Sequence, residues 1–176
     1  MARPLIDVQY LDRWTPEGVA DRPETIFVFG DNTKRRGRGG QACIRGLPNA
    51  IGICTKLKPA MTPDAFFNDD SFDANAVLIA DDFKRLWRVF DSGGNNGVVP
   101  SAVCFSSGGL GTGLAQMPKK APRTYAFLQQ CQTMFVGCCR GEIPVSEFTA
   151  LLDGLKWSVE VVGRNLIADV SVNHGQ

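Results

Sequence analysis

The chain has very little histidine, and this shortage limits the chemistry that it can support. Its 176 residues include one histidine, His174, close to the C-terminal end. A histidine base and a zinc site built on histidine are therefore not expected. The six cysteines contain no Cys-x-x-Cys pair, so the spacing of a structural zinc site is missing as well. We expect no metal and no resident cofactor, which leaves lysine, aspartate, glutamate, serine and cysteine for any catalysis.

Long apolar stretches and a strong net charge are also missing. No segment is long and apolar enough to predict a membrane-spanning helix, and no signal peptide is recognisable. Lysine and arginine total 19 against 18 for aspartate and glutamate, so the overall charge does not favour nucleic acid or an acidic membrane. We expect a cytoplasmic protein, with its cysteines reduced and with no membrane contact.

The pattern of apolar residues predicts a single α/β domain over residues 1–176. The hydrophobic content of 44% is that of a globular protein. Apolar residues that recur every three or four positions predict a helix over residues 73–91, and further helices are expected from Pro118 and over residues 146–152. Strands are expected at residues 4–11, 26–29, 50–54, 98–105, 157–162 and 166–172. This alternation predicts a sheet with helices on its faces.

Two glycine-rich loops each follow an apolar run that predicts a strand. The first covers residues 30–42, and the second covers residues 106–118. Glycine allows backbone amides to form a concave anion site and lets the chain approach a ligand closely. In open α/β sheets, ligands bind beyond the carboxyl ends of the strands, where both loops and the pair Thr55 and Lys56 would emerge. Two such loops predict a ligand with two phosphates.

The common nucleotide motifs are absent from both loops. Neither ends in Gly-Lys-Ser or Gly-Lys-Thr, and residues 37–42 lack the last glycine or alanine of a dinucleotide fingerprint, so a common kinase or dehydrogenase is not expected. Basic side chains crowd the first loop. Guanidinium groups and amide nests favour the same anionic partner, with a solvated basic loop as the alternative. These basic residues are Lys34, Arg35, Arg36, Arg38 and Arg45.

The order of these features resembles a known family. A strand is followed by Asn32 and the glycine-rich residues 37–42, and another strand ends at Lys56. After a helix, a further strand leads to the glycine-rich residues 108–114 and to a helix opened by proline. This order is similar to the macrodomain family, which binds ADP-ribose, and above all to its ADP-ribosyl glycohydrolase branch of terminal ADP-ribose glycohydrolases and DNA-ADP-ribose-removing antitoxins. The resemblance implies a single macrodomain-like mixed sheet with helices on both faces.

The resemblance also implies the residues of the site. Lys56 falls where this branch carries a catalytic lysine, which could attack the anomeric carbon of ADP-ribose if the site lowers its pKa. Ala115 stands where some members carry a catalytic aspartate, which leaves Asp31 as the substitute. The first loop would line the distal ribose and a phosphate, and the second would wrap the diphosphate. The expected ligand-binding residues are Gly30, Asn32, Arg38, Gly39, Gly40, Gln41, Ala42, Ser107, Gly108, Gly109, Leu110, Gly111, Thr112, Gly113 and Leu114.

These observations predict a protein that binds ADP-ribose or an NAD-derived nucleotide, free or attached to protein or nucleic acid. Hydrolysis of an ADP-ribosyl bond through Lys56 is the expected activity. A non-catalytic module that reads or sequesters such a nucleotide is the first alternative, favoured by Ala115. Nucleic-acid binding through residues 34–38 is the second, and the neutral overall charge and scarce neighbouring aromatics count against it.

Overall fold

The computed structural model describes residues 4–94 and 97–154. The expected strands at residues 157–162 and 166–172, like His174, lie outside the described residues. Helical residues 145–154 end the described part. Before them, in order, come β1 (Asp7–Leu11), α1 (Pro16–Ala20), β2 (Thr25–Asn32), the 3-10 helix η1 (Gly40–Ile44), β3 (Ala50–Lys56), η2 (Pro63–Ala65), η3 (Asp69–Ser71), α2 (Phe72–Asp91), β4 (Ala102–Ser106), α3 (Met117–Lys120) and α4 (Pro122–Cys139).

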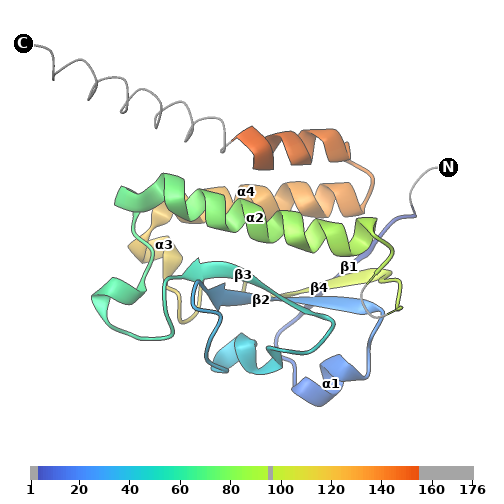
Figure 1. The fold of residues 1–176 in the computed structure, drawn as a ribbon, viewed down its shortest axis with the longest axis horizontal. Helices are drawn as coiled ribbons and strands as arrows, with labels where there is room; N and C mark the ends of the chain where they lie inside the picture. Colours follow the sequence, from blue (N-terminus) through green and yellow to red (C-terminus); the bar gives the residue numbers. More distant parts are fainter. Residues whose placement is uncertain (1–3, 95–96, 155–176) are drawn as a thin grey trace, which may run out of the picture.

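The four strands form one sheet in the order β1-β4-β2-β3 (Figure 1). Every strand pair is parallel, because each connection returns the chain to the same end of the sheet before the next strand begins. The α/β class predicted from the sequence is confirmed, whereas the mixed sheet is not found among the described strands. The parallel arrangement brings the carboxyl ends of β2, β3 and β4 to one edge of the sheet, which positions the loops that follow them.

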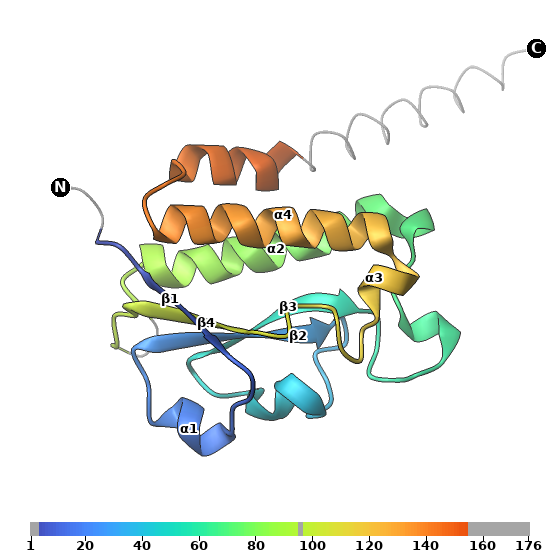
Figure 2. The ribbon, with the colours of Figure 1, turned by 180° about the vertical axis from the view of Figure 1, so that it is seen from behind.

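Helices cover both faces of the sheet (Figures 1 and 2). The long helices α2 and α4 lie on one face, and the short α1 and η1 lie on the other. Alternating side chains of β2 enter different cores, since Val28 packs into the cluster under α2 and α4 while Phe27 and Phe29 pack into the cluster with Val19 of α1. Because β2 is buried on both faces, its sequence is a continuous apolar run at residues 26–29 rather than an alternation of apolar and polar residues.

The helical region that follows the second glycine loop is split in two. The sequence predicted one helix from Pro118, but α3 ends at Lys120 and α4 begins at Pro122. Ala121 between them is not helical, with φ −148° and ψ 66°, because a residue that precedes proline avoids the helical conformation. The carboxylate of Asp69 caps the start of α4 by accepting hydrogen bonds from the amides of residues 123 and 124, at 2.8 and 2.9 Å.

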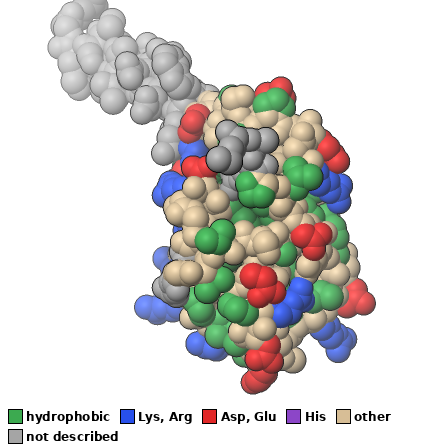
Figure 3. Space-filling view, turned by 90° about the vertical axis from the view of Figure 1, so that its right-hand side faces the viewer, with side chains coloured by type: hydrophobic (Ala, Val, Ile, Leu, Met, Phe, Trp, Pro, Cys, Tyr) green, Lys and Arg blue, Asp and Glu red, His purple; other side chains and the backbone are tan. Residues whose placement is uncertain are grey.

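The surface at the end of the molecule where the strands begin has a mixed character. Figure 3 shows acidic, basic and hydrophobic side chains interspersed on this face. None of the helices within residues 4–94 and 97–154 has both the length and the apolar character needed to cross a membrane. The opposite end, where the strands finish, is where the glycine-rich loops meet.

Candidate functional site

A pocket of about 460 Å³ lies at the carboxyl ends of β2 and β3. Three loops surround it: residues 36–42 after β2, residues 59–61 after β3 and residues 109–115 after β4. These loops touch one another, since a Cβ at Gly37 would lie 3.2 Å from Pro59, and one at Gly40 would lie 3.8 Å from the Leu114 side chain. The strand ends of a parallel sheet therefore bring together segments that are far apart in the sequence.

Most of the residues expected at the site line this pocket. Both glycine loops and the end of β3 contribute to it, so Lys56 faces the same space as the two loops. The expected residues found here are Gly30, Asp31, Asn32, Gly39, Gly40, Gln41, Ala42, Lys56, Gly109, Gly111, Gly113 and Leu114.

Five expected ligand-binding residues are not among those that line the pocket: Arg38, Ser107, Gly108, Leu110 and Thr112. Leu110 is fully buried in the core beneath α2 and α4, so its side chain anchors the loop. The Ser107 hydroxyl donates a hydrogen bond to Asp12, and the Thr112 hydroxyl donates to the carbonyl of Gly108, at 2.6 Å. These hydroxyls hold the shape of the second loop.

Eight other residues line the pocket although the sequence did not predict them to be catalytic or ligand-binding. Residues 59–61 begin three positions after the end of β3, so the rule that ligands bind beyond strand ends could have found them. The sequence marked Arg36 and Arg45 only as part of a basic cluster. The eight residues are Arg36, Gly37, Arg45, Thr55, Pro59, Ala60, Met61 and Ala115.

Backbone amides of both glycine loops lack hydrogen-bond acceptors within the described residues. This is true of Gly37 and Gly39 in the first loop and of Gly111 and Gly113 in the second. A Cβ at Gly111, where φ is 78°, would lie 2.6 Å from the sulfur of Met117, so glycine is required for the loop to take this path. Unpaired amides need water or a ligand as a partner, which makes the two loops suited to binding an anion.

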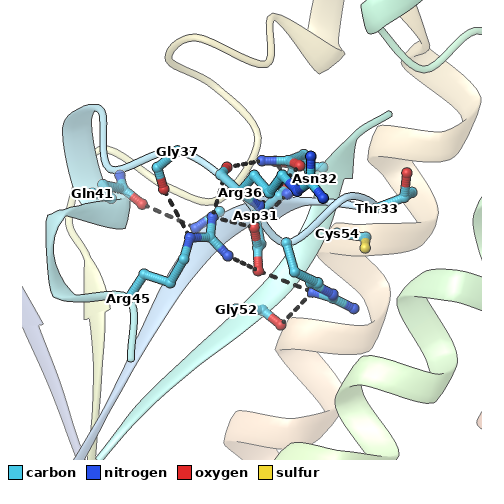
Figure 4. Close-up of polar contacts among 12 residues, drawn as sticks. Asp31, Asn32, Thr33, Arg36, Gly37, Gln41, Arg45, Gly52 and Cys54 are labelled. Carbon is cyan, nitrogen blue, oxygen red and sulfur yellow. Dashed lines mark hydrogen bonds and ion pairs between the residues drawn. The ribbon is translucent and has the colours of Figure 1, made fainter. Parts of the chain in front are cut away.

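The buried side chain of Asp31 points toward Arg45 (Figure 4) and is also paired with Arg35, and both arginines are partly exposed. Its carboxylate accepts two hydrogen bonds from Arg45, at 2.5 and 2.8 Å, one from Arg35 at 3.1 Å and one from the amide of Asn32 at 2.6 Å. Burial by itself raises the pKa of Asp31, but the hydrogen bonds from Arg45, Asn32 and Arg35 outweigh it and hold the pKa below its usual value. The carboxylate therefore stays ionised and engaged, as an anchor for the loop.

Arg45 fixes the path of the first glycine loop. Its Nε donates to the carbonyl of Gly37 at 2.8 Å, and its Nη2 donates to the carbonyl of Arg36 at 3.3 Å (Figure 4). Its guanidinium also lies over the ring of Phe29, 5.3 Å from the centroid. Because Arg45 is paired with Asp31 through two hydrogen bonds, it holds loop carbonyls without adding an uncompensated charge to the pocket.

A second group of polar contacts joins α2 to β3, the outer strand of the described sheet. Arg35 extends from Asp31 to Asp82 of α2, at 2.5 Å, and Asp82 accepts the amide of Cys54 at 2.7 Å. Arg85 donates to the carbonyl of Gly52 at 2.7 Å. These contacts satisfy backbone groups on the strand edge that no neighbouring strand covers, and they tie the first loop to the main helical layer.

We expect Asp31→Asn to destabilise the protein at neutral pH by about 2 kcal/mol, because it leaves the partly buried Arg45 guanidinium without its counter-charge. The folded-state pKa of Asp31 is lowered, so its contribution is complete above the unfolded value of about 4 and is lost as the pH falls through the folded value. The difference between the wild type and the variant in urea unfolding should therefore shrink on acidification. Asp64→Asn, at an exposed ion pair, is the control and should change stability little. Equal stability of wild type and Asp31→Asn at pH 7 would contradict the anchoring role.

Lys56 ends β3 with its amine in largely apolar surroundings. Its Nζ donates to the carbonyl of Leu114 at 3.2 Å, lies 3.3 Å from the sulfur of Met61 and sits 4.4 Å from the centroid of the Phe66 ring. No carboxylate among the described residues pairs with it, and burial lowers its pKa. A lysine in this setting has an increased fraction of neutral amine, which is the nucleophilic form.

The pocket carries more positive than negative charge. Its charged lining residues are Asp31, Arg36, Arg45 and Lys56, of which Asp31 and Arg45 neutralise one another. The exposed guanidinium of Arg36 and the amine of Lys56 have no carboxylate partner among the described residues. The pocket therefore favours an anionic ligand.

The chain matches a known protein family. The sequence model of a protein family, described as a family of unknown function (DUF7831), matches residues 9–131, which is more than half of the chain. No curated protein and no solved structure gives a significant match.

Proposed function

We propose that this chain, which belongs to the DUF7831 family of unknown function, binds ADP-ribose or an NAD-derived nucleotide in the pocket at the carboxyl end of its sheet. One observation carries the proposal: Gly37 and Gly39 of the first loop and Gly111 and Gly113 of the second line a single pocket, and their amides have no acceptor among the described residues. The free amides of the two glycine loops suit a ligand with two phosphates. Arg36 and Lys56, which have no carboxylate partner among the described residues, add to the electrostatic attraction for the phosphates. A volume of about 460 Å³ is within the range of small-molecule sites.

The likeness to macrodomains supports the choice of nucleotide. It depends on the two glycine loops and on Lys56, which the fold brings to the same pocket. We also propose that the whole domain has a macrodomain-like fold. In this arrangement the diphosphate lies between the loops, and a ribose reaches the amine of Lys56.

The proposed activity is hydrolysis of an ADP-ribosyl bond through Lys56. The lone pair of Nζ forms a bond to the anomeric carbon, and the glycosidic bond breaks with its electron pair passing to the leaving group. The proton lost from the alkylated amine neutralises that leaving group. Water then displaces the lysine, which releases ADP-ribose and regenerates the amine.

A non-catalytic binder is the second candidate, and the contacts of Asp31 favour it. Within the described residues, Asp31 is the only carboxylate that lines the pocket, and its oxygens are occupied by Arg45, Arg35 and the amide of Asn32. A carboxylate held in this way is a poor proton donor or acceptor. Without another acid or base, the pocket would hold a nucleotide without cleaving it.

The two candidates are separated by titrating the protein with ADP-ribose and then searching for a lysine adduct by mass spectrometry. Binding together with an adduct on Lys56 and release of ADP-ribose from a modified substrate supports the hydrolase. Tight binding without adduct or turnover supports the binder. Absence of binding at millimolar ADP-ribose overturns the proposal as a whole.

We expect Arg36→Met to weaken ADP-ribose binding less than tenfold and to reduce its salt dependence, because an exposed ion pair contributes under about 1 kcal/mol. Arg38→Met removes the same charge two residues away, at a position that does not line the pocket, and is the matched control. Calorimetric titrations at two salt concentrations measure both effects. An equal loss in the two variants would mean that the loop attracts the ligand only through its general charge.

A further inference from the structure

The lining of the pocket combines two kinds of group. The glycine loops contribute backbone without side chains, whereas Pro59, Ala60, Met61 and Leu114 contribute apolar residues, with Leu114 coming from within the second loop. The amine of Lys56 contacts both the sulfur of Met61 and the carbonyl of Leu114. We call these four residues the apolar ledge. A phosphate bound by the glycine loops would leave the apolar ledge without a ligand contact.

Two side chains of the ledge are unusually exposed for large apolar residues. Met61 is 57% exposed and Leu114 is 61% exposed, and neither side chain is part of the hydrophobic core. A polar side chain at either position would be better solvated, so their apolar character is not explained by folding. Exposed apolar groups that border a polar pocket are typical of ligand contacts.

The loop that carries Met61 has a fixed shape. The amide of Leu57 donates to the carbonyl of Ala65 at 2.8 Å, which closes the base of the loop. Lys58 forms an ion pair with Asp64 across the loop. Met61 is therefore held beside the pocket by the loop, while its unbranched side chain can still adapt to a flat surface.

We propose that the apolar ledge binds a planar heterocyclic ring of the ligand, next to the amine of Lys56. The inference rests on the proposed function, because it assumes that the glycine loops hold the phosphates of the same molecule. Thioether and aliphatic groups pack well against flat rings, and they exclude water from the neighbouring lysine. The ring sets specificity: a phosphorylated ligand with a ring binds more tightly than pyrophosphate.

The ring can come from two parts of the ligand. It is either the adenine of a free nucleotide or the group bonded to the second ribose, as nicotinamide is in NAD. Both sources present the same flat surface, so the ledge alone does not choose between them. A series of pyrophosphate, ADP, ADP-ribose and NAD separates the two.

The test is a calorimetric titration of this series into wild type, Met61→Ser, Leu114→Ser and Met61→Leu. Val99→Ser is the matched control, because Val99 is 67% exposed but does not line the pocket. We expect the two pocket serine variants to lose about tenfold in affinity for ring-bearing ligands, to bind pyrophosphate within about twofold of wild type, and to unfold at the wild-type temperature. Met61→Leu keeps an apolar side chain and should therefore retain a preference for ring-bearing ligands over pyrophosphate, whereas Val99→Ser should behave as wild type.

Loss of affinity for ADP and ADP-ribose places adenine on the ledge, and loss for NAD alone places the second ring there. Either result supports the inference. If wild type binds pyrophosphate as tightly as the nucleotides, or if the serine variants weaken pyrophosphate equally, the ledge does not recognise a ring and the inference is overturned. If wild type binds none of the four ligands, the proposed function itself has failed.

Discussion

Lys56→Ala should abolish turnover of an ADP-ribosylated substrate and retain much of the nucleotide binding. In the proposed function the glycine loops, which line the pocket together with Lys56, provide the phosphate contacts, whereas the covalent step depends on the amine of Lys56. We expect turnover to fall at least about a hundredfold, with a much smaller change in the dissociation constant. Release of ADP-ribose measured alongside calorimetric binding gives both quantities.

Lys56→Arg separates a nucleophile from a simple cation. Arginine keeps the positive charge but stays protonated at any usable pH, so it cannot attack carbon. This variant should therefore be as inactive as Lys56→Ala, while Lys119→Ala, at an exposed lysine of α3, should keep wild-type turnover. An active Lys56→Arg variant would show that Lys56 only pairs with phosphate.

Gly113→Glu should weaken ADP-ribose binding by more than about 2 kcal/mol and leave the fold intact. Gly113 suits this test because a Cβ there has no atom within 4 Å, so the new side chain has room in the free protein. In the complex, the carboxylate would enter the space of the ligand and repel its phosphates. Calorimetry gives the affinity, and thermal unfolding checks the fold.

Gly113→Gln provides the control, because it adds nearly the same bulk without the charge. It should lose less affinity than Gly113→Glu, and the difference measures the repulsion. Gly111 and Gly40 are poorer probes, since a side chain at Gly111 would strike Met117 and both glycines have a positive φ. Unchanged affinity in Gly113→Glu would place the phosphates elsewhere.

The sequence by itself determined the helix over residues 73–91, the early strands and the position of both glycine loops at strand ends. It could do so because these features depend on local periodicity and on the conformational freedom of glycine. The rule that ligands bind beyond the strand ends then predicted that Lys56 and both loops would share one space. These inferences need only the direction of each strand and the short segment that follows it.

Only the tertiary structure decided which contacts each side chain makes at the carboxyl ends of the strands. Leu110 lies within a glycine loop but is buried in the core, and Met61 becomes part of the pocket only because its loop folds back beside β3. Asp31 is engaged by Arg45, fourteen positions along the chain, and by Arg35, which reaches on to Asp82 of α2. Such pairings depend on contacts between distant segments, for which local sequence patterns carry no signal. The sequence thus predicted which segments surround the pocket, and long-range packing determined how their side chains pair.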